Sequence, residues 1–162
     1  NYFTFFNDGD NKPDRKKKIG STGGIYNIPA GNYEAVEKTI QKAMNSGSGG
    51  DAPENNCEAL LIAIKNNPHA KEFVMIADNF ANIKDFELIK QINKPIHIII
   101  CGTNNFIVNT DYLDLARATK GSIHSIEQDI ENMVNINEGQ IIKFEGKKYV
   151  LEHGKFHQLI DM

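Results

Sequence analysis

Two segments of this chain carry residue types that could hold a metal ion. The first is the glycine-rich stretch Gly47-Ser48-Gly49-Gly50-Asp51-Ala52-Pro53-Glu54-Asn55-Asn56, and the second is the apolar run Phe73-Val74-Met75-Ile76-Ala77, which ends on Asp78. A glycine-rich turn lets the backbone approach a ligand closely. A strand that stops on a carboxylate delivers it to the carboxyl edge of a sheet, where open α/β folds bind ligands. Together the two segments suggest a metal site without accompanying catalytic residues.

The elements that must position these residues alternate between strand and helix. Strands are expected at residues 2–6, 19–28, 73–77, 96–101 and 122–126, and helices at 33–44, 51–64, 86–92 and 112–118. Asn32 is expected to cap the first helix, and Pro68 to stop the second. The runs 73–77 and 96–101 are continuously apolar, which is typical of central strands buried on both faces. This order predicts an α/β fold with a Rossmann-like, open, mostly parallel sheet flanked by helices.

The character of the sequence changes from Glu127 onward. Ile130, Met133 and Val134 allow a terminal helix. Residues 140–151 then predict two strands around the turn Glu145-Gly146, and residues 156–159 a third. We therefore expect a domain over residues 1–134 and a small C-terminal β appendage, a hairpin over residues 135–162 that packs on the same domain.

From its second strand onward, this order of parts resembles a von Willebrand factor type A domain, over about residues 2–130. Phe5-Phe6-Asn7-Asp8 resembles the end of that family's second strand. Gly49-Gly50-Asp51-Ala52-Pro53-Glu54 resembles an acidic variant of its second metal loop, and Ile76-Ala77-Asp78 its third. The family's first metal segment, D-x-S-x-S, does not occur in the 162 residues. We expect that the gene product extends N-terminally and that this chain is a truncated version, or that another segment supplies the missing strand.

The resemblance implies a cation-dependent adhesion site at the carboxyl edge of the sheet. Its ligands would be Asp78, Asp51 and Glu54, and its rim would include Asp8, Ser48, Asn79 and Thr103. The ion would be Mg²⁺, or Mn²⁺ or Ca²⁺, and a carboxylate from a partner protein would complete its coordination. Because the upstream ligands are missing, we expect this half-built site to be hydrated or unoccupied in the truncated chain.

Each candidate ligand also has a plain structural interpretation. Asp51 and Glu54 have the spacing of a capping box at a helix start, which needs no metal. Asp78 could end its strand and cap the segment after it. The stretch from Asp8 to Asp14 imitates a calcium loop, but it lacks the downstream glutamate and the flanking helices, which favours a polar turn.

Composition excludes several other classes of function. With 18 basic and 21 acidic residues the net charge is -3, so no global field recruits nucleic acid or an anionic membrane. The one basic run, at residues 15–18, is interpreted as a solvated loop. No apolar segment approaches the roughly 18 residues needed to insert into a membrane. Cys57 and Cys101 are both expected to be buried, which favours a reducing compartment such as the cytoplasm.

The sequence shows no Ser-His-Asp or Cys-His arrangement and neither phosphate-loop motif. The five histidines lack a structural zinc spacing and are assigned no role. We therefore interpret the chain as a non-enzymatic protein-binding module. The alternatives are a Mg²⁺-dependent hydrolase or phosphatase-like enzyme that uses the same carboxylates, and a scaffold whose cation site has decayed.

Overall fold

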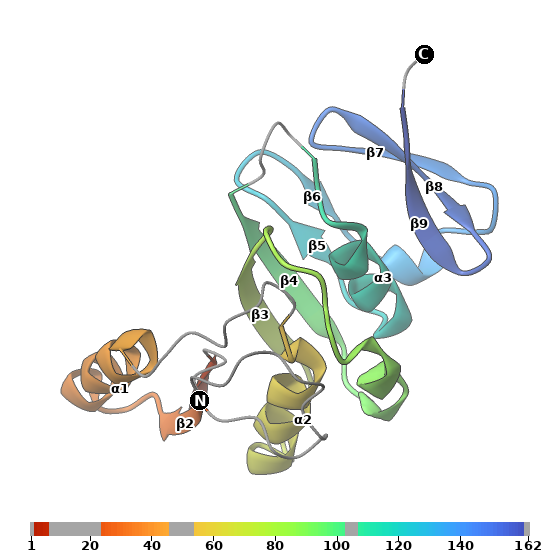
Figure 1. Ribbon diagram of the computed structural model, residues 1–162. Coiled ribbons are helices and arrows are strands. Elements are labelled where there is room, and N and C mark those ends of the chain that lie inside the picture. The colour runs from red at the N-terminus through yellow and green to blue at the C-terminus, as the bar shows by residue number, and fades with distance from the viewer. Residues whose placement is uncertain (1, 7–23, 46–53, 103–106, 161–162) are drawn as a thin grey trace. The chain divides into compact units, whose positions relative to one another are not determined.

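The computed structural model describes residues 2–6, 24–45, 54–102 and 107–160 (Figure 1). The predicted calcium-like turn, the basic run and most of the glycine-rich stretch lie outside these ranges. The chain forms two compact units. Unit 1 comprises residues 1–70 and 83–92, and unit 2 comprises residues 71–82 and 93–162. Each unit is described by itself.

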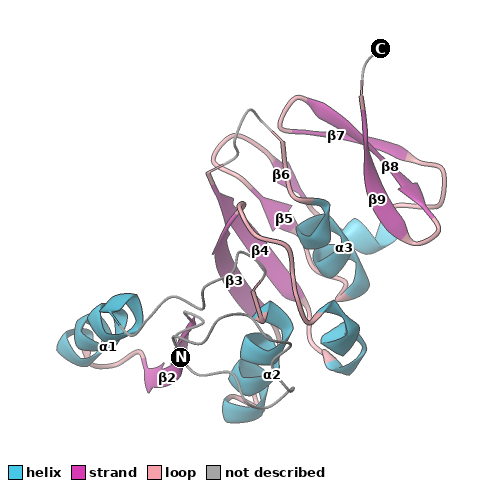
Figure 2. Cartoon of the chain, viewed as in Figure 1, coloured by secondary structure: helices cyan, strands magenta, loops and turns pink. Residues whose placement is uncertain are grey.

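Unit 1 contains a two-stranded antiparallel sheet and three helical segments (Figure 2). Strand β1 (Tyr2–Phe6) pairs with β2 (Ile25–Pro29), and both contact α1 (Tyr33–Asn45) and α2 (Asn56–Asn66). The 3-10 helix η1 (Phe86–Gln91) packs on α2. Asn32 caps α1 as predicted, since its Oδ1 accepts a hydrogen bond from the backbone N–H of Ala35 at 3.1 Å.

The start of α2 differs from the prediction. The helix begins at Asn56 rather than at residue 51, and Glu54 precedes it in a parallel bridge to Ile83. Glu54 therefore cannot be the third residue of a capping box on this helix, and that interpretation was wrong. The donors at the helix start are accepted instead by Asp85, whose Oδ1 and Oδ2 bind the backbone N–H groups of Cys57 at 3.0 Å and Glu58 at 2.7 Å.

Unit 2 is built on a four-stranded sheet with the order β3-β4-β5-β6. Strands β3 (Phe73–Asp78), β4 (Ile96–Cys101) and β5 (Ile123–His124) are parallel, and β6 (Asp129–Ile130) is antiparallel to β5. Helix α3 (Thr110–Ala118) contacts β4 and β5, and it also contacts the last strand of a C-terminal meander. The chain is therefore a mixed α/β protein with a partly parallel sheet.

The meander consists of β7 (Ile141–Phe144), β8 (Lys147–Glu152) and β9 (Lys155–Leu159). All three predicted strands are present, and the Glu145-Gly146 turn is confirmed, with both residues at positive φ. The predicted terminal helix before them was wrong. Residues 129–130 form β6 instead, and Met133–Asn135 forms only a 3-10 turn, η3. Pairing with β5 outweighs the helical spacing of the apolar residues in this stretch.

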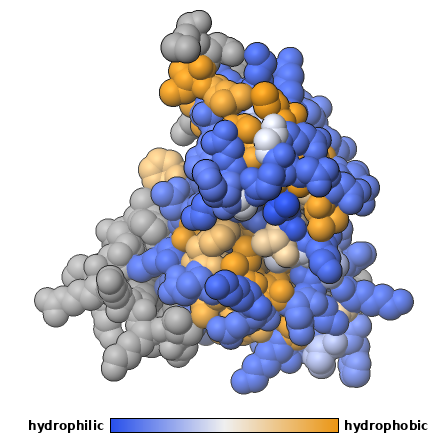
Figure 3. Space-filling view, turned by 90° about the vertical axis from the view of Figure 1, so that its right-hand side faces the viewer, coloured by the Kyte–Doolittle hydropathy of each residue, from blue (hydrophilic) through white to orange (hydrophobic). Residues whose placement is uncertain are grey.

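The interpretation of β3 as a central strand buried on both faces was also wrong. It lies at the end of the strand order, and its residues alternate in exposure, with Val74 64% and Ile76 70% exposed. The inward residues of β4 and β5, in contrast, are completely buried: Ile96, Ile98 and Ile123. One face of this sheet thus belongs to the core and the other presents apolar side chains at the surface. In the space-filling view, hydrophobic patches interrupt a mostly hydrophilic face (Figure 3).

The approach to β5 leaves no room for a side chain at Gly121. An added Cβ would lie 1.8 Å from the backbone oxygen of Ile96. This contact lets β5 enter the sheet beside β4, where Ile98 N–H donates to the Ser122 carbonyl at 2.9 Å. The close backbone approach therefore fixes the position of Ser122 and of the residues after it.

Candidate functional site

Asp78 occupies the position predicted for a cation ligand in unit 2. It is the last residue of β3, pairs in register with Cys101, and is exposed. Its Oδ1 accepts the backbone N–H of Phe80 at 2.9 Å, which closes a turn after the strand. The parallel sheet thus ends on a solvent-facing carboxylate. Cys101, expected to be buried, is exposed at the same edge.

The remaining predicted site residues are only partly described. Glu54 belongs to unit 1, where its carbonyl accepts the N–H of Lys84 at 2.9 Å. Asp51 and the rim residues Asp8, Ser48 and Thr103 lie outside the described ranges. Of the seven predicted residues, the structure therefore places Asp78 and its rim neighbour Asn79 side by side at the carboxyl edge of the unit 2 sheet.

Asn79 and Asn109 fix the loops at this edge. The Asn79 amide donates to the Ile107 carbonyl at 2.6 Å and accepts the Asn109 backbone N–H at 2.8 Å. The Asn109 amide donates to the Ala81 carbonyl at 2.9 Å, and its Oδ1 accepts from Asp111 N–H at 3.0 Å, which caps α3. The loop after β3 and the start of α3 are thereby bonded to each other. Sequence reasoning missed Asn109, although an asparagine directly before a helix is a recognised cap signal.

A shallow, open hollow of about 630 Å³ lies at this edge. The polar residues Asn79, Asn109 and Thr110 form one part of its lining, beside exposed Phe80. Its complete lining is Asn79, Phe80, Asn82, Ile107, Val108, Asn109, Thr110, Phe156, His157 and Gln158. This hollow therefore combines polar and aromatic side chains, and Asp78 is not among its lining residues.

A buried carboxylate lies between α3 and β9. The Oδ1 of Asp114 accepts the backbone N–H of Phe156 at 2.8 Å, and the residue is only 6% exposed. Burial raises the pKa of Asp114 to about 6, against the opposing effects of the Phe156 hydrogen bond and of Lys155. This carboxylate thus joins the meander to the helix and changes charge close to neutral pH.

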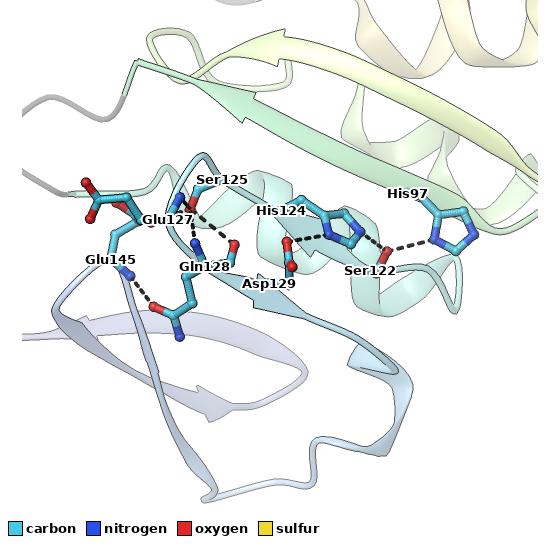
Figure 4. Close-up of polar contacts among 8 residues, drawn as sticks. All are labelled: His97, Ser122, His124, Ser125, Glu127, Gln128, Asp129 and Glu145. Carbon is cyan, nitrogen blue, oxygen red and sulfur yellow. Dashed lines mark hydrogen bonds and ion pairs between the residues drawn. The ribbon is translucent and has the colours of Figure 1, made fainter.

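A second polar cluster crosses the sheet of unit 2 (Figure 4). Ser122 Oγ lies 2.5 Å from His124 Nε2, and His124 Nδ1 lies 2.8 Å from Asp129 Oδ1. On its other side, Ser122 Oγ lies 2.7 Å from His97 Nδ1. The sequence showed no Ser-His-Asp arrangement, but the structure brings Ser122, His124 and Asp129 into contact. The signal available was the i, i+2 spacing of Ser122 and His124, which places both on one face of a strand.

The nitrogen order in this cluster matches that of a nucleophilic Ser-His-Asp triad. Ser122, however, is only 1% exposed, and its hydroxyl is engaged by two imidazoles at once. An acyl group could reach the oxygen only by displacing one of the rings. The arrangement is better suited to join strands β4, β5 and β6 through side chains than to attack a substrate.

Side chains of the turn between β5 and β6 form hydrogen bonds with the meander. Ser125 Oγ donates to Glu145 Oε1 and also accepts the backbone N–H of Gln128 at 2.9 Å. Gln128 in turn donates to the Lys143 carbonyl at 2.8 Å and accepts the N–H of Glu145 at 3.0 Å. These contacts tie the β7–β8 turn to the sheet (Figure 4).

Within residues 2–6, 24–45, 54–102 and 107–160, no group of three or more His, Cys, Asp or Glu side chains is placed to hold a metal ion. None of the helices in these ranges is long and apolar enough to cross a membrane. Comparison with protein-family models, with curated proteins and with solved structures returned no match.

Proposed function

We propose that this chain is a protein-binding module with a von Willebrand A-like, Rossmann-type arrangement. In this proposal Asp78 holds a divalent cation at the carboxyl edge of the unit 2 sheet, and the ion receives a carboxylate from a partner protein. The observation that carries the proposal is the exposed Asp78 at the end of a parallel strand, next to loops that Asn79 and Asn109 bond to each other.

The donor chemistry in unit 2 suits Mg²⁺ or Mn²⁺. Asp78 uses Oδ1 to accept a backbone hydrogen bond, and no described residue is bonded to its Oδ2. Mg²⁺ keeps several waters and is commonly held by one or two carboxylates. The Asn79 oxygen is already used by the Asn109 N–H, so this residue supports the loop rather than the ion. When bound, the ion would supply the positive charge that attracts the partner's carboxylate.

The experiment uses acetate as a minimal partner carboxylate and Mn²⁺ as the ion. We expect protein-bound Mn²⁺ to speed the relaxation of the acetate methyl protons beyond the effect of free Mn²⁺, and EDTA to reverse it. Asp78→Asn should abolish the enhancement, whereas Asp129→Asn, which removes another exposed carboxylate of the same sheet, should retain it.

Two results would contradict this proposal. If the acetate methyl protons relax equally with wild-type protein and with Asp78→Asn, the chain is a scaffold without a working cation site. Hydrolysis of p-nitrophenyl phosphate by the Mg²⁺-loaded chain, lost in Asp78→Asn, would instead support the phosphatase-like enzyme.

A further inference from the structure

Five polar side chains form a continuous row across unit 2. His97 Nε2 lies 3.5 Å from Glu72 Oε2, and His97 Nδ1 begins the series of contacts through Ser122 and His124 to Asp129. The two end carboxylates are 69% and 66% exposed, the imidazoles are 29% and 24% exposed, and Ser122 is buried. The row thus has solvent at both ends and a single buried hydroxyl at its centre.

Hydrogen-bond chemistry fixes the direction of this row when both imidazoles are neutral. An ionised carboxylate only accepts, so His124 carries its hydrogen on Nδ1, toward Asp129. Its Nε2 is then an acceptor and receives the Ser122 O–H. Ser122 in turn accepts from the Nδ1–H of His97. Each of these three contacts has one donor and one acceptor, but the bare Nε2 of neutral His97 then faces the Glu72 carboxylate with no hydrogen between them.

One additional proton can be added without loss of any of these hydrogen bonds. On His97 it occupies Nε2, facing Glu72. Alternatively His97 Nδ1–H passes its proton to Ser122 Oγ while the Ser122 hydroxyl proton moves to His124 Nε2. The charge then lies on His124 beside Asp129, and His97 keeps its remaining hydrogen on Nε2. The number of protons is the same in both states. Only the donors and acceptors of the hydrogen bonds on either side of Ser122 have changed places.

A second proton cannot be added in this way. Both ring nitrogens that face Ser122 would then be donors, and the serine hydrogen would lose its acceptor in the row. Ser122 is 1% exposed, so water does not readily replace that acceptor. Two positive rings would also face each other across one hydroxyl group, which is unfavourable.

We propose that the row from Glu72 to Asp129 is a one-proton switch. It takes up one proton with its hydrogen bonds intact, and that proton can lie on His97 beside Glu72 or on His124 beside Asp129. Uptake of a second proton leaves the Ser122 hydrogen without an acceptor in the row.

Few other charges share this face of the sheet. Opposite His97 the neighbouring strand β3 contributes the apolar Val74, and opposite His124 the strand β4 contributes Ile99. Strand alternation places Asp78 and Cys101 on the same face, four residues farther along their strands, or about 13 Å away. Among the described residues, Glu72 and Asp129 are therefore the charged groups bonded directly to the two histidines.

The test is NMR titration of the imidazole rings in the whole chain. Replacing one histidine, in His97→Gln or His124→Gln, should make the remaining ring take up its proton at a higher pH than the second ring to be protonated does in the wild type. The effect should shrink clearly in a Ser122→Ala background, because the shared hydroxyl is gone. His153→Gln, which changes a histidine outside the row, should shift neither resonance.

The proposal would be overturned if each ring titrated in the same way whether or not the other histidine was present. It would also be overturned if one ring affected the other equally with and without the Ser122 hydroxyl.

Discussion

At the scale of single residues, two buried carboxylates stabilise the fold by accepting backbone hydrogen bonds. Asp85 serves unit 1 by accepting two backbone hydrogen bonds at the start of α2, and Asp114 serves unit 2 by joining α3 to β9. Neither role is visible in the sequence, because each partner lies 27 to 42 residues away. A local capping box was the nearest pattern that sequence reasoning could find, and a tertiary contact replaced it.

Asp85→Asn should destabilise the protein by about 1–3 kcal/mol, since one of the two acceptor oxygens becomes an NH₂ group that faces a backbone N–H. Burial raises the pKa of Asp85, while its bonds to Glu58 and Cys57 oppose that rise. Urea denaturation followed by circular dichroism measures the free energy of unfolding. Glu87→Gln, an exposed change on η1, is the control; an equal effect of the two substitutions would contradict the capping role.

Asp114 should make stability depend on pH. Its pKa is raised from 3.8 to about 6 on folding, so the folded state binds more protons than the unfolded state between these values. The contribution of this group to stability is therefore full below about pH 4 and is lost as pH rises through about 6.

Asp114→Asn keeps an acceptor for the Phe156 N–H but removes the titration. The variant should show a flatter stability profile between pH 5 and pH 7.5 than the wild type, measured as the denaturation midpoint at each pH. Glu152→Gln, an exposed change on β8, should leave the profile unaltered. A profile that is the same in Asp114→Asn and wild type would show that this carboxylate does not titrate as described.

At the scale of elements, the positions of strands and turns were predicted better than the burial of the strand faces or the pairing of short strands. Hydrophobic runs located β3, β4 and the meander, and the Glu145-Gly146 turn was readable because glycine readily adopts the positive φ found there. The exposed face of β3 was not readable, because an apolar run is the same whether one or both faces are covered. The short β6 was missed because only its pairing with β5 defines it.

Gly121→Ala should disrupt the junction of β4 and β5. Its new Cβ would meet the backbone oxygen of Ile96, which cannot move without breaking the parallel pairing. We expect a loss of at least about 3 kcal/mol, or failure to fold, measured by thermal denaturation and soluble yield. Gly31→Ala, where nothing lies within 4 Å of the added atom, is the matched control. Tolerance of alanine at position 121 would mean that β5 does not enter the sheet here.

The turn between β8 and β9 can be improved. His153 and Gly154 have φ values of 52° and 77°, which suit the Asn-Gly pair of a two-residue hairpin. His153→Asn should therefore raise the free energy of unfolding by about 0.5 kcal/mol, because asparagine tolerates the left-handed region. His153→Ala should lower it. Stabilisation by alanine would indicate a different turn geometry.

At the scale of the whole molecule, the chain combines a core face with a face that remains apolar and exposed on β3. The proposed function depends on the carboxyl edge of that sheet, where Asp78 is presented and where Asn79 and Asn109 hold the surrounding loops. The position of Asp78 was predictable, because the apolar run of β3 ends on it. Asn109 was readable as a helix cap, but its bonds to the loop after β3 and the row from Glu72 to Asp129 required the tertiary structure.

The most direct test of the central claim is a Mn²⁺ titration followed by amide NMR. Bound Mn²⁺ broadens resonances close to it, so the proposal predicts early loss of the Asn79, Phe80 and Gly102 amide signals. Asp78→Asn should keep these signals at the same Mn²⁺ concentration, while Asp129→Asn should lose them as the wild type does. Uniform broadening across the chain, or the same pattern in Asp78→Asn, would contradict a cation site at the carboxyl edge of the sheet.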